Sequence, residues 1–365
     1  MSFIIDAHED MAYNILTFGR DYRLSVAETR QREEGNALIY DNTGRSLLGW
    51  PEYQQGRVAV IFSTLFLAPQ NHAGGDWENQ VYGSFSQARE LHRKQLNVYR
   101  ELCDRNPDKF RQILTLNDLN DVLRPWQQPV TDPAATAPVG LILSMEGAEG
   151  VQELSELEEW WQLGLRFIGP VWAGTRFFGG MYEKGPATKE GFQLLNTMAE
   201  IGYGLDISHM TESSALAAID HYEGVVIASH SNVRKLVPGP SEERHLSDAI
   251  LERLIERDGV VGVLPFNKFL VSNWQKGDPR ENVTLKHLAN HIDAICQIAG
   301  NARHVAIGTD FDGGFGWPAV PLEVNTIADV QKIGPILSER GYSTEDIDAI
   351  FGTNWQRILE RVLPK

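Results

Sequence analysis

Short apolar runs recur along this chain, and five of them lead into side chains that can bind a metal ion or contact a substrate. The residues in question are His8 with Asp10, Glu146, His209, His230 and Asp310. A charged or imidazole side chain is unfavourable at the end of a buried strand unless that end opens onto a site. Because the carboxyl ends of the strands in a (β/α)₈ barrel meet at one rim, this arrangement predicts such a barrel.

The pattern of strands and helices supports the same fold. Near-continuous Val, Ile and Leu runs predict parallel strands near residues 2–8, 58–66, 139–145, 165–171, 204–208, 224–229, 259–265 and 304–309. Helical patterns cover residues 85–105, 153–163, 211–221, 285–299 and 343–362. Alternation of the two is typical of a parallel α/β fold, so we interpret residues 1–365 as a single TIM-barrel domain.

Two connections are long, near residues 11–57 and 172–190. Long connections in a compact domain are usually lids or binding loops, and the glycines of the second favour an irregular loop over the rim. The Pro-, Thr- and Ala-rich stretch 125–139 is predicted to be an exposed connection.

Charge and composition exclude several classes of function. A net charge of −16 argues against nucleic acid, whose phosphates require clustered Lys and Arg. No run approaches the roughly 18 apolar residues of a membrane span, and no basic region precedes an apolar stretch at the start. We therefore expect a cytoplasmic protein. Its two cysteines, Cys103 and Cys296, are predicted to be free thiols.

His8 and Asp10 stand two apart at the end of the first predicted strand, so both side chains can reach one ion. Imidazole and carboxylate together suit a borderline cation such as Zn²⁺. His209 and His230 follow consecutive strands in matching Ser-His pairs, and we assign them to a second ion.

Glu146 can join the two ions through its two carboxylate oxygens. The alternative is a glutamate that only begins a helix.

Asp310 ends the eighth predicted strand, where a carboxylate can accept a proton from an activated water and pass it to a leaving amine. The glycines after Asp312 indicate that the chain is already turning there. We therefore interpret Asp312 as holding the turn, although the two roles could be exchanged.

With these residues placed, the chain resembles the membrane (renal) dipeptidase family, zinc peptidases of the amidohydrolase superfamily. The resemblance runs along almost the whole chain, through the segments Asp6-Ala7-His8-Glu9-Asp10, Ser144-Met145-Glu146-Gly147, Leu163-Gly164-Leu165-Arg166, Asp206-Ile207-Ser208-His209, Ser229-His230-Ser231-Asn232, Gly308-Thr309-Asp310-Phe311-Asp312-Gly313 and Phe351-Gly352 with Asn354. It implies a TIM barrel that holds two zinc ions, with Co²⁺ or Mn²⁺ as possible substitutes.

The resemblance also implies roles for individual residues. His8 and Asp10 would hold one ion, His209 and His230 the other, Glu146 both, and Asp310 would be the proton shuttle. Arg244 is the candidate for gripping the substrate carboxylate; the alternative is a surface arginine paired with Glu242 or Glu243. The family also makes a homodimer possible.

Two positions depart from the family pattern. Trp172 stands where the family has a histidine that contacts the scissile carbonyl, and Phe266 stands where a tyrosine is expected. Both changes remove polar contacts near the reacting group, and Arg176 or an ion alone would have to compensate.

The predicted function is hydrolysis of a dipeptide, or of a similar small amide, by a hydroxide bridging two zinc ions. Two alternatives stay open because of Trp172 and Phe266. One is an amidohydrolase acting on another amide or ester, such as an N-acyl amino acid or a lactone. The other is a binding protein that kept its metals and lost turnover.

Overall fold

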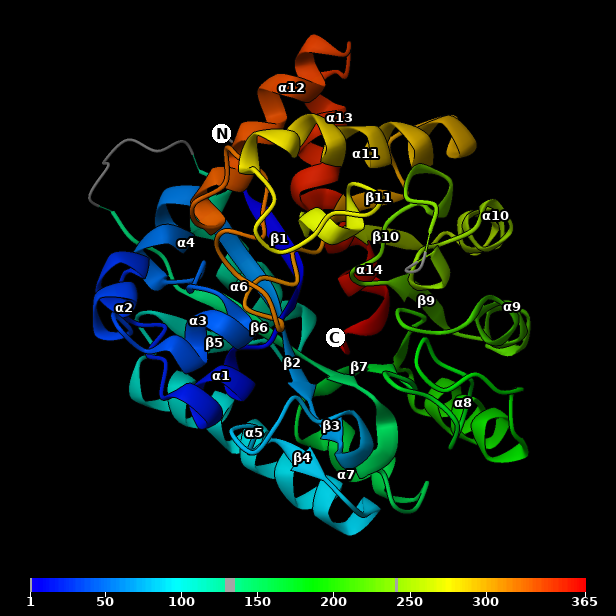
Figure 1. Ribbon diagram of the computed structural model, residues 1–365. Helices are drawn as coiled ribbons and strands as arrows, with labels where there is room; N and C mark the ends of the chain where they lie inside the picture. Colours follow the sequence, from blue (N-terminus) through cyan, green and yellow to red (C-terminus); the bar gives the residue numbers. More distant parts are fainter. Residues whose placement is uncertain (1, 129–134, 240–241) are drawn as a thin grey trace.

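The computed structural model describes residues 2–128, 135–239 and 242–365. Within them, eight parallel strands hydrogen-bond in the order β1-β2-β6-β7-β8-β9-β10-β11. Their bounds are β1 (Ile4–Glu9), β2 (Val58–Phe66), β6 (Val139–Glu146), β7 (Leu165–Gly169), β8 (Gly204–Asp206), β9 (Val225–Ala228), β10 (Val260–Val263) and β11 (Val305–Ile307). The predicted (β/α)₈ barrel is confirmed, and each strand lies where the apolar runs predicted it (Figure 1).

Helices surround this barrel (Figure 1). They are α1 (Met11–Phe18), α2 (Val26–Arg32), α3 (Ala37–Thr43), α4 (Trp50–Gly56), α5 (Phe85–Arg105), α6 (Leu116–Trp126), α7 (Glu156–Gln162), α8 (Lys189–Ile201), α9 (Glu212–His221), α10 (Asp248–Glu256), α11 (Leu285–Ala299), α12 (Ile333–Glu339), α13 (Thr344–Asp348) and α14 (Asn354–Val362). Three short strands lie outside the barrel path: β3 (Ala68–Pro69), β4 (Val81–Tyr82) and β5 (Phe110–Gln112). No helix in the described part of the chain is long and apolar enough to cross a bilayer.

The barrel closes between its first and last strands. Asp6 of β1 accepts hydrogen bonds from both the backbone N–H and the hydroxyl of Thr309, 2.6 and 2.5 Å away. A parallel bridge between Glu9 and Phe311 and the Asp310 N–H to His8 carbonyl bond continue the seam toward the rim. These contacts place Asp310 beside the end of β1.

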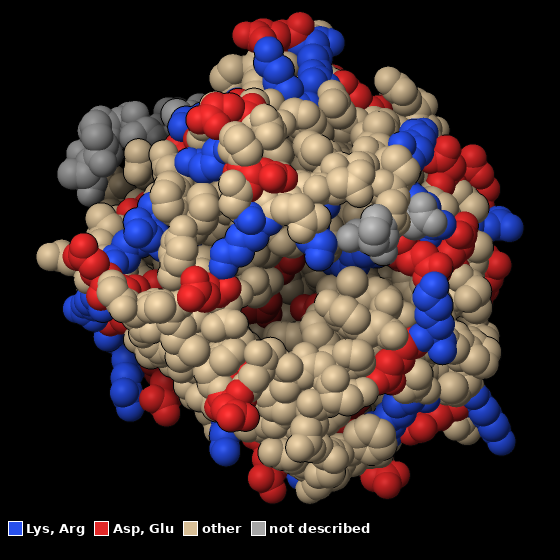
Figure 2. Space-filling model, viewed as in Figure 1, with Lys and Arg blue, Asp and Glu red and all other residues tan. Residues whose placement is uncertain are grey.

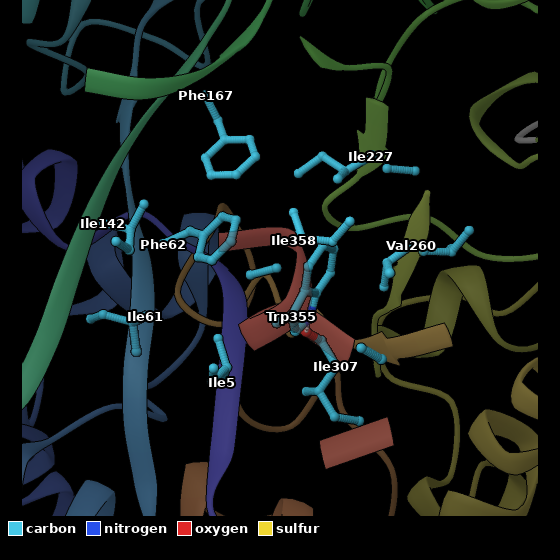
Figure 3. Close-up of a cluster of buried hydrophobic side chains, with 14 of the residues drawn as sticks. Ile5, Ile61, Phe62, Ile142, Phe167, Ile227, Val260, Ile307, Trp355 and Ile358 are labelled. Atoms are coloured by element: carbon cyan, nitrogen blue, oxygen red, sulfur yellow. Dashed lines mark hydrogen bonds between the residues drawn. The ribbon is translucent and has the colours of Figure 1, made fainter. Parts of the chain in front are cut away.

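The barrel interior is filled by apolar side chains below the rim (Figure 3). Trp355 of α14 lies between Phe62 and Ile307, and its indole N–H donates to the Ile307 carbonyl at 2.8 Å. Only glycine fits at positions 262 and 308, because a Cβ on either residue would lie within 2 Å of the Ser229 carbonyl oxygen. The two glycines let the Ser229–His230 segment pack closely against the neighbouring strands.

Two predicted connections differ from the structure. Residues 11–57, predicted as a long loop, contain the four helices α1 to α4. This connection buries Tyr22 and Leu48, which lie between the helices, and Tyr53 of α4 in the same core as the barrel strands. Packing of this kind stabilises helices too short to form alone. The 172–190 segment is irregular up to α8, as predicted.

Of the stretch 125–139, residues 129–134 lie outside the described part of the chain. Trp126 is buried at the end of α6, so this position is not exposed as predicted. Its indole N–H donates to the Pro138 carbonyl at 3.0 Å, which holds the two ends of the stretch together. Cys103 and Cys296 are both free, on α5 and α11.

Candidate functional site

The structure brings His8, Asp10, Glu146, His209, His230 and Asp310 together at the C-terminal rim. Three overlapping groups of these side chains have ligand atoms within 4.8 Å of one another: His8-Asp10-Glu146, Glu146-His209-His230 and His8-His230-Asp310. Glu146 belongs to the first two groups. A carboxylate shared in this way can bind two cations at once.

Glu146 lies at the centre of the cluster. Its Oε2 lies 2.9 Å from His8 Nε2, and its Oε1 lies 2.7 Å from His209 Nε2. His230 Nε2 is 2.8 Å from His209 Nε2 and 4.0 Å from Glu146 Oε1, so both imidazoles point to the same side of the carboxylate. The His8 nitrogen and the nitrogens of this pair therefore converge on the two oxygens of one carboxylate from opposite sides.

The side chains of the cluster fit a metal ion such as zinc, and their hydrogen bonding supports this independently of the sequence pattern. Among the described residues, Asp10 Oδ1 is buried and has no hydrogen-bond partner, and His8 Nε2, although 2.9 Å from Glu146 Oε2, makes no hydrogen bond with acceptable geometry. Buried polar atoms are normally satisfied, so each unsatisfied one requires an explanation. Imidazole nitrogen and carboxylate oxygen are ligands that Zn²⁺ prefers.

The protonation states of two of these histidines favour metal binding. Burial lowers the pKa of His209 to about 4 and the pKa of His230 well below its ordinary value. Both imidazoles are therefore neutral near pH 7, the form that offers a lone pair to a metal.

Asp310 stands at the edge of the cluster, with its Oδ1 3.8 Å from His8 Nε2. Burial raises the pKa of its carboxyl well above the ordinary range. Its backbone φ of 56° lies in the left-handed region, as do those of His209 (68°) and Asp312 (61°). Strained backbone of this kind is concentrated at functional sites, where surrounding contacts hold it in place.

Asp312 does not reach the cluster. Its carboxylate accepts hydrogen bonds from the hydroxyls of Tyr22 and Ser46 and from the Leu47 N–H, and it pairs with Arg20 at 3.1 Å. It anchors the connection between β1 and β2 to the rim, in agreement with the interpretation that Asp312 holds the turn.

Arg244 is buried beside the cluster, with 3% of its surface exposed. Its guanidinium donates to the His230 carbonyl at 2.7 Å and to the Ser231 hydroxyl at 3.0 Å, and lies 3.3 Å from His209 Nε2. The alternative of a surface arginine paired with a neighbouring glutamate is therefore wrong; Glu243 pairs instead with Lys184.

A cleft of about 230 Å³ opens above the cluster and is lined by Asp10, Glu146, His209 and Asp310. Figure 2 shows this hollow in the face of the molecule, with acidic side chains at its bottom. Trp172 forms part of the cleft wall, with its ring 6.4 Å from the His209 ring and 5.1 Å from Phe66.

Phe266 lies elsewhere: its ring stacks on Phe315 at 4.2 Å, and it is not among the cleft-lining residues. Arg176 does not compensate for the missing histidine either. Its guanidinium binds Glu190 and the carbonyls of Val151 and Gln152, and it is not among the cleft-lining residues.

Sequence reasoning missed several residues of the cleft. Tyr13, Thr43, His72, Trp77 and Glu78 all line it. The first two belong to the long 11–57 connection, whose length predicted a covering role. The other three lie in the connection between β2 and α5, which carried no signal of function.

Comparisons with known proteins agree with this geometry. Residues 1–363 match the membrane dipeptidase family, peptidase family M19. An uncharacterized dipeptidase of Schizosaccharomyces pombe is 26% identical over 98% of this chain and 80% of its own length. An uncharacterized protein encoded in the pqqA 5′ region of Klebsiella pneumoniae is 30% identical over 61% of this chain and 82% of its own.

Solved structures share the fold at low sequence identity. A metallopeptidase from Rhodobacter sphaeroides, bound to a phosphinate mimic of L-Ala-D-Ala, superimposes with a TM-score of 0.79 at 21% identity, covering 99% of this chain and 100% of its own. The probable dipeptidase PvdM from Pseudomonas aeruginosa has a TM-score of 0.78 at 18% identity, covering 99% and 95%.

Proposed function

The chain belongs to the membrane dipeptidase family of metallopeptidases, and from this premise we propose that it hydrolyses dipeptides, or dipeptide-like small amides, with two zinc ions. The observation that carries the proposal is the sharing of Glu146 between two ligand groups. His8 and Asp10 would hold one ion, and His209 and His230 the other. Co²⁺ and Mn²⁺ suit the same ligands.

The bound ions would supply an activated hydroxide between them and polarise the scissile carbonyl. The residues of the chain do the rest. Arg244 takes the substrate carboxylate, since a planar guanidinium matches its two oxygens. Asp310 accepts the proton of the attacking water and delivers it to the departing amine as the C–N bond breaks.

Trp172 forms part of the wall of the cleft that the proposed substrate would enter. Its indole can donate one hydrogen bond and cannot become a cation, so it does not reproduce the charge of an imidazolium at the carbonyl. We propose that it acts as an apolar wall of the cleft. Hydrolysis of another amide or ester is the second candidate function, and this replacement is the observation that favours it.

The test is an assay of zinc-loaded protein, with metal content measured by elemental analysis, against a panel of dipeptides that includes one with a C-terminal D-residue. Release of free amino acids that stops on chelation and returns with zinc supports the proposal. Absence of turnover of every dipeptide, in protein with its full metal content, refutes the proposal. In that case, turnover of N-acyl amino acids or lactones would favour the second candidate.

A further inference from the structure

The walls of the cleft have a distinctive composition. Four aromatic rings, those of Tyr13, Phe66, Trp77 and Trp172, line it. Its carboxylates are Asp10, Glu146 and Asp310 of the metal cluster together with Glu78, and its described lining contains no lysine or arginine.

Glu78 differs from the other three carboxylates because it belongs to none of the metal-binding groups. It accepts hydrogen bonds from the Tyr13 hydroxyl and, at 2.6 Å, from the Gly74 N–H. Among the described residues, no lysine, arginine or histidine forms an ion pair with it. The two hydrogen bonds therefore fix the position of a carboxylate that has no cationic partner.

Three of these rings, those of Tyr13, Phe66 and Trp172, form a continuous wall between Glu78 and the metal cluster. Tyr13 contacts Phe66 with ring centroids 5.6 Å apart, and Phe66 contacts Trp172 at 5.1 Å. Aromatic faces attract ammonium and guanidinium groups, and they also pack against the methylene stem of a long side chain. A wall of rings that ends at a carboxylate is thus suited to a long cationic side chain.

The proposed role of Arg244 sets which end of a dipeptide would enter the cleft. Its guanidinium lies against His209, which lines the cleft. A substrate whose carboxylate is held by Arg244 would direct its N-terminal residue away from it, into the cleft. The α-ammonium is two bonds from the scissile carbonyl carbon and stays near the cluster, so only the side chain of that residue extends toward Glu78.

We propose, resting on the proposed function, that the cleft selects dipeptides whose N-terminal residue is lysine or arginine, and that Glu78 is the specificity-determining residue. A charge-assisted hydrogen bond at a half-buried site, together with a cation–π contact, corresponds to a preference of about 5- to 20-fold.

The test compares kcat/KM of the zinc-loaded enzyme for Lys-Ala, Met-Ala and Glu-Ala, whose first side chains are cationic, neutral and anionic. We expect Lys-Ala to exceed Met-Ala by about 5- to 20-fold and Glu-Ala to be the poorest substrate. In Glu78→Gln the Lys-Ala to Met-Ala ratio should fall to about one. The ratio is measured within one preparation, so it does not depend on the fraction of folded enzyme.

Asp76→Asn is the matched control. Asp76 is an exposed acid two residues away that does not line the cleft, so this variant should keep the wild-type ratio.

Equal turnover of Lys-Ala and Met-Ala by the wild type, or an unchanged ratio in Glu78→Gln, overturns this inference alone. No turnover of these three dipeptides, with turnover of another member of the dipeptide panel, also overturns this inference alone. No turnover of any dipeptide in the panel at full metal content refutes the proposed function and the inference with it.

Discussion

Ser229 Oγ lies 2.8 Å from Nδ1 of His230, its neighbour in the chain. The same hydroxyl donates its proton to the carboxylate of Asp206, which also accepts the Ser229 N–H at 3.0 Å. A hydroxyl has a single proton, so the serine oxygen must accept a hydrogen bond from His230 Nδ1–H. His230 Nε2 is then left with its lone pair directed toward His209 and Glu146.

Ser229→Ala should therefore weaken metal binding without removing a ligand. Loss of an outer partner of a ligating histidine typically lowers metal affinity about 10- to 100-fold. Competition with a chromogenic zinc chelator measures this change. Ser213→Ala, on the exposed face of α9, is the control and should leave the metal affinity unchanged. Equal metal affinity in both variants would show that the Ser229 hydroxyl does not orient His230.

Asp310→Asn should abolish turnover while the metals stay bound. The amide keeps the shape of the carboxylate but cannot accept the proton, and general acid–base groups contribute about 100- to 10,000-fold. Steady-state kinetics beside elemental analysis separates the two effects. A variant that loses zinc together with activity would indicate that Asp310 is chiefly a ligand.

Arg244→Lys should impair the hydrolysis of dipeptides that have a free carboxylate more than the hydrolysis of the corresponding dipeptide amides. The variant keeps the positive charge but loses the planar fork, so we expect kcat/KM for the free acid to fall about 10- to 100-fold. The ratio of free acid to amide is the measurement. If kcat/KM falls equally for both substrates, Arg244 acts only by supporting His230 and Ser231, which its guanidinium also contacts.

Gly308→Ala should destabilise the protein. The added Cβ would lie 1.8 Å from the Ser229 carbonyl oxygen, where only backbone movement could relieve the clash. Overpacking in a core costs about 1–3 kcal/mol, so the thermal midpoint should fall by several degrees. Gly185→Ala is the matched control, since its Cβ would meet nothing within 4 Å; a similar loss in both variants would exclude the steric explanation.

Stability should decrease in mild acid partly because of His92. Burial lowers its pKa from 6.5 to about 3. Between these values the unfolded chain binds a proton at this position that the folded chain does not, so the folded state loses stability as pH falls through this window. From pH 6.5 to 5 the loss is about 2 kcal/mol.

The matching experiment records thermal midpoints at pH 7.5 and 5.0. His92→Leu should show a smaller difference between the two values than the wild type. His221 is exposed, and His221→Leu should show the wild-type difference. An unchanged pH dependence of the thermal midpoint in His92→Leu would show that His92 does not contribute to the loss of stability in acid.

Much of the barrel could be predicted because its strands are local features. Each is a short apolar run, and the predicted ranges of the helices over residues 85–105 and 285–299 match α5 and α11. The 11–57 connection could not be predicted in the same way. Its helices are only seven or eight residues long, and they depend on packing against the barrel rather than on their own sequence.

The candidate ligands could be found from sequence because each lies at the end of a strand or just after it, and the strand ends of a barrel converge. The rest of the cleft could not. Glu78 and Trp77 come from a connection whose position over the rim depends on contacts such as the Tyr13–Glu78 hydrogen bond, between residues distant in the chain. The burial of Arg244 was equally hidden in a stretch rich in charged residues.

The sequence by itself determined the barrel and the six rim residues, because strand length, apolar periodicity and the residue after each strand are properties of neighbouring positions. Only the tertiary structure decided that Glu146 lies between His8 and His209, that Asp206 holds the Ser229 hydroxyl that orients His230, and that Glu78 faces the cleft. These relationships depend on distances between segments far apart in the chain, and such distances are set by packing.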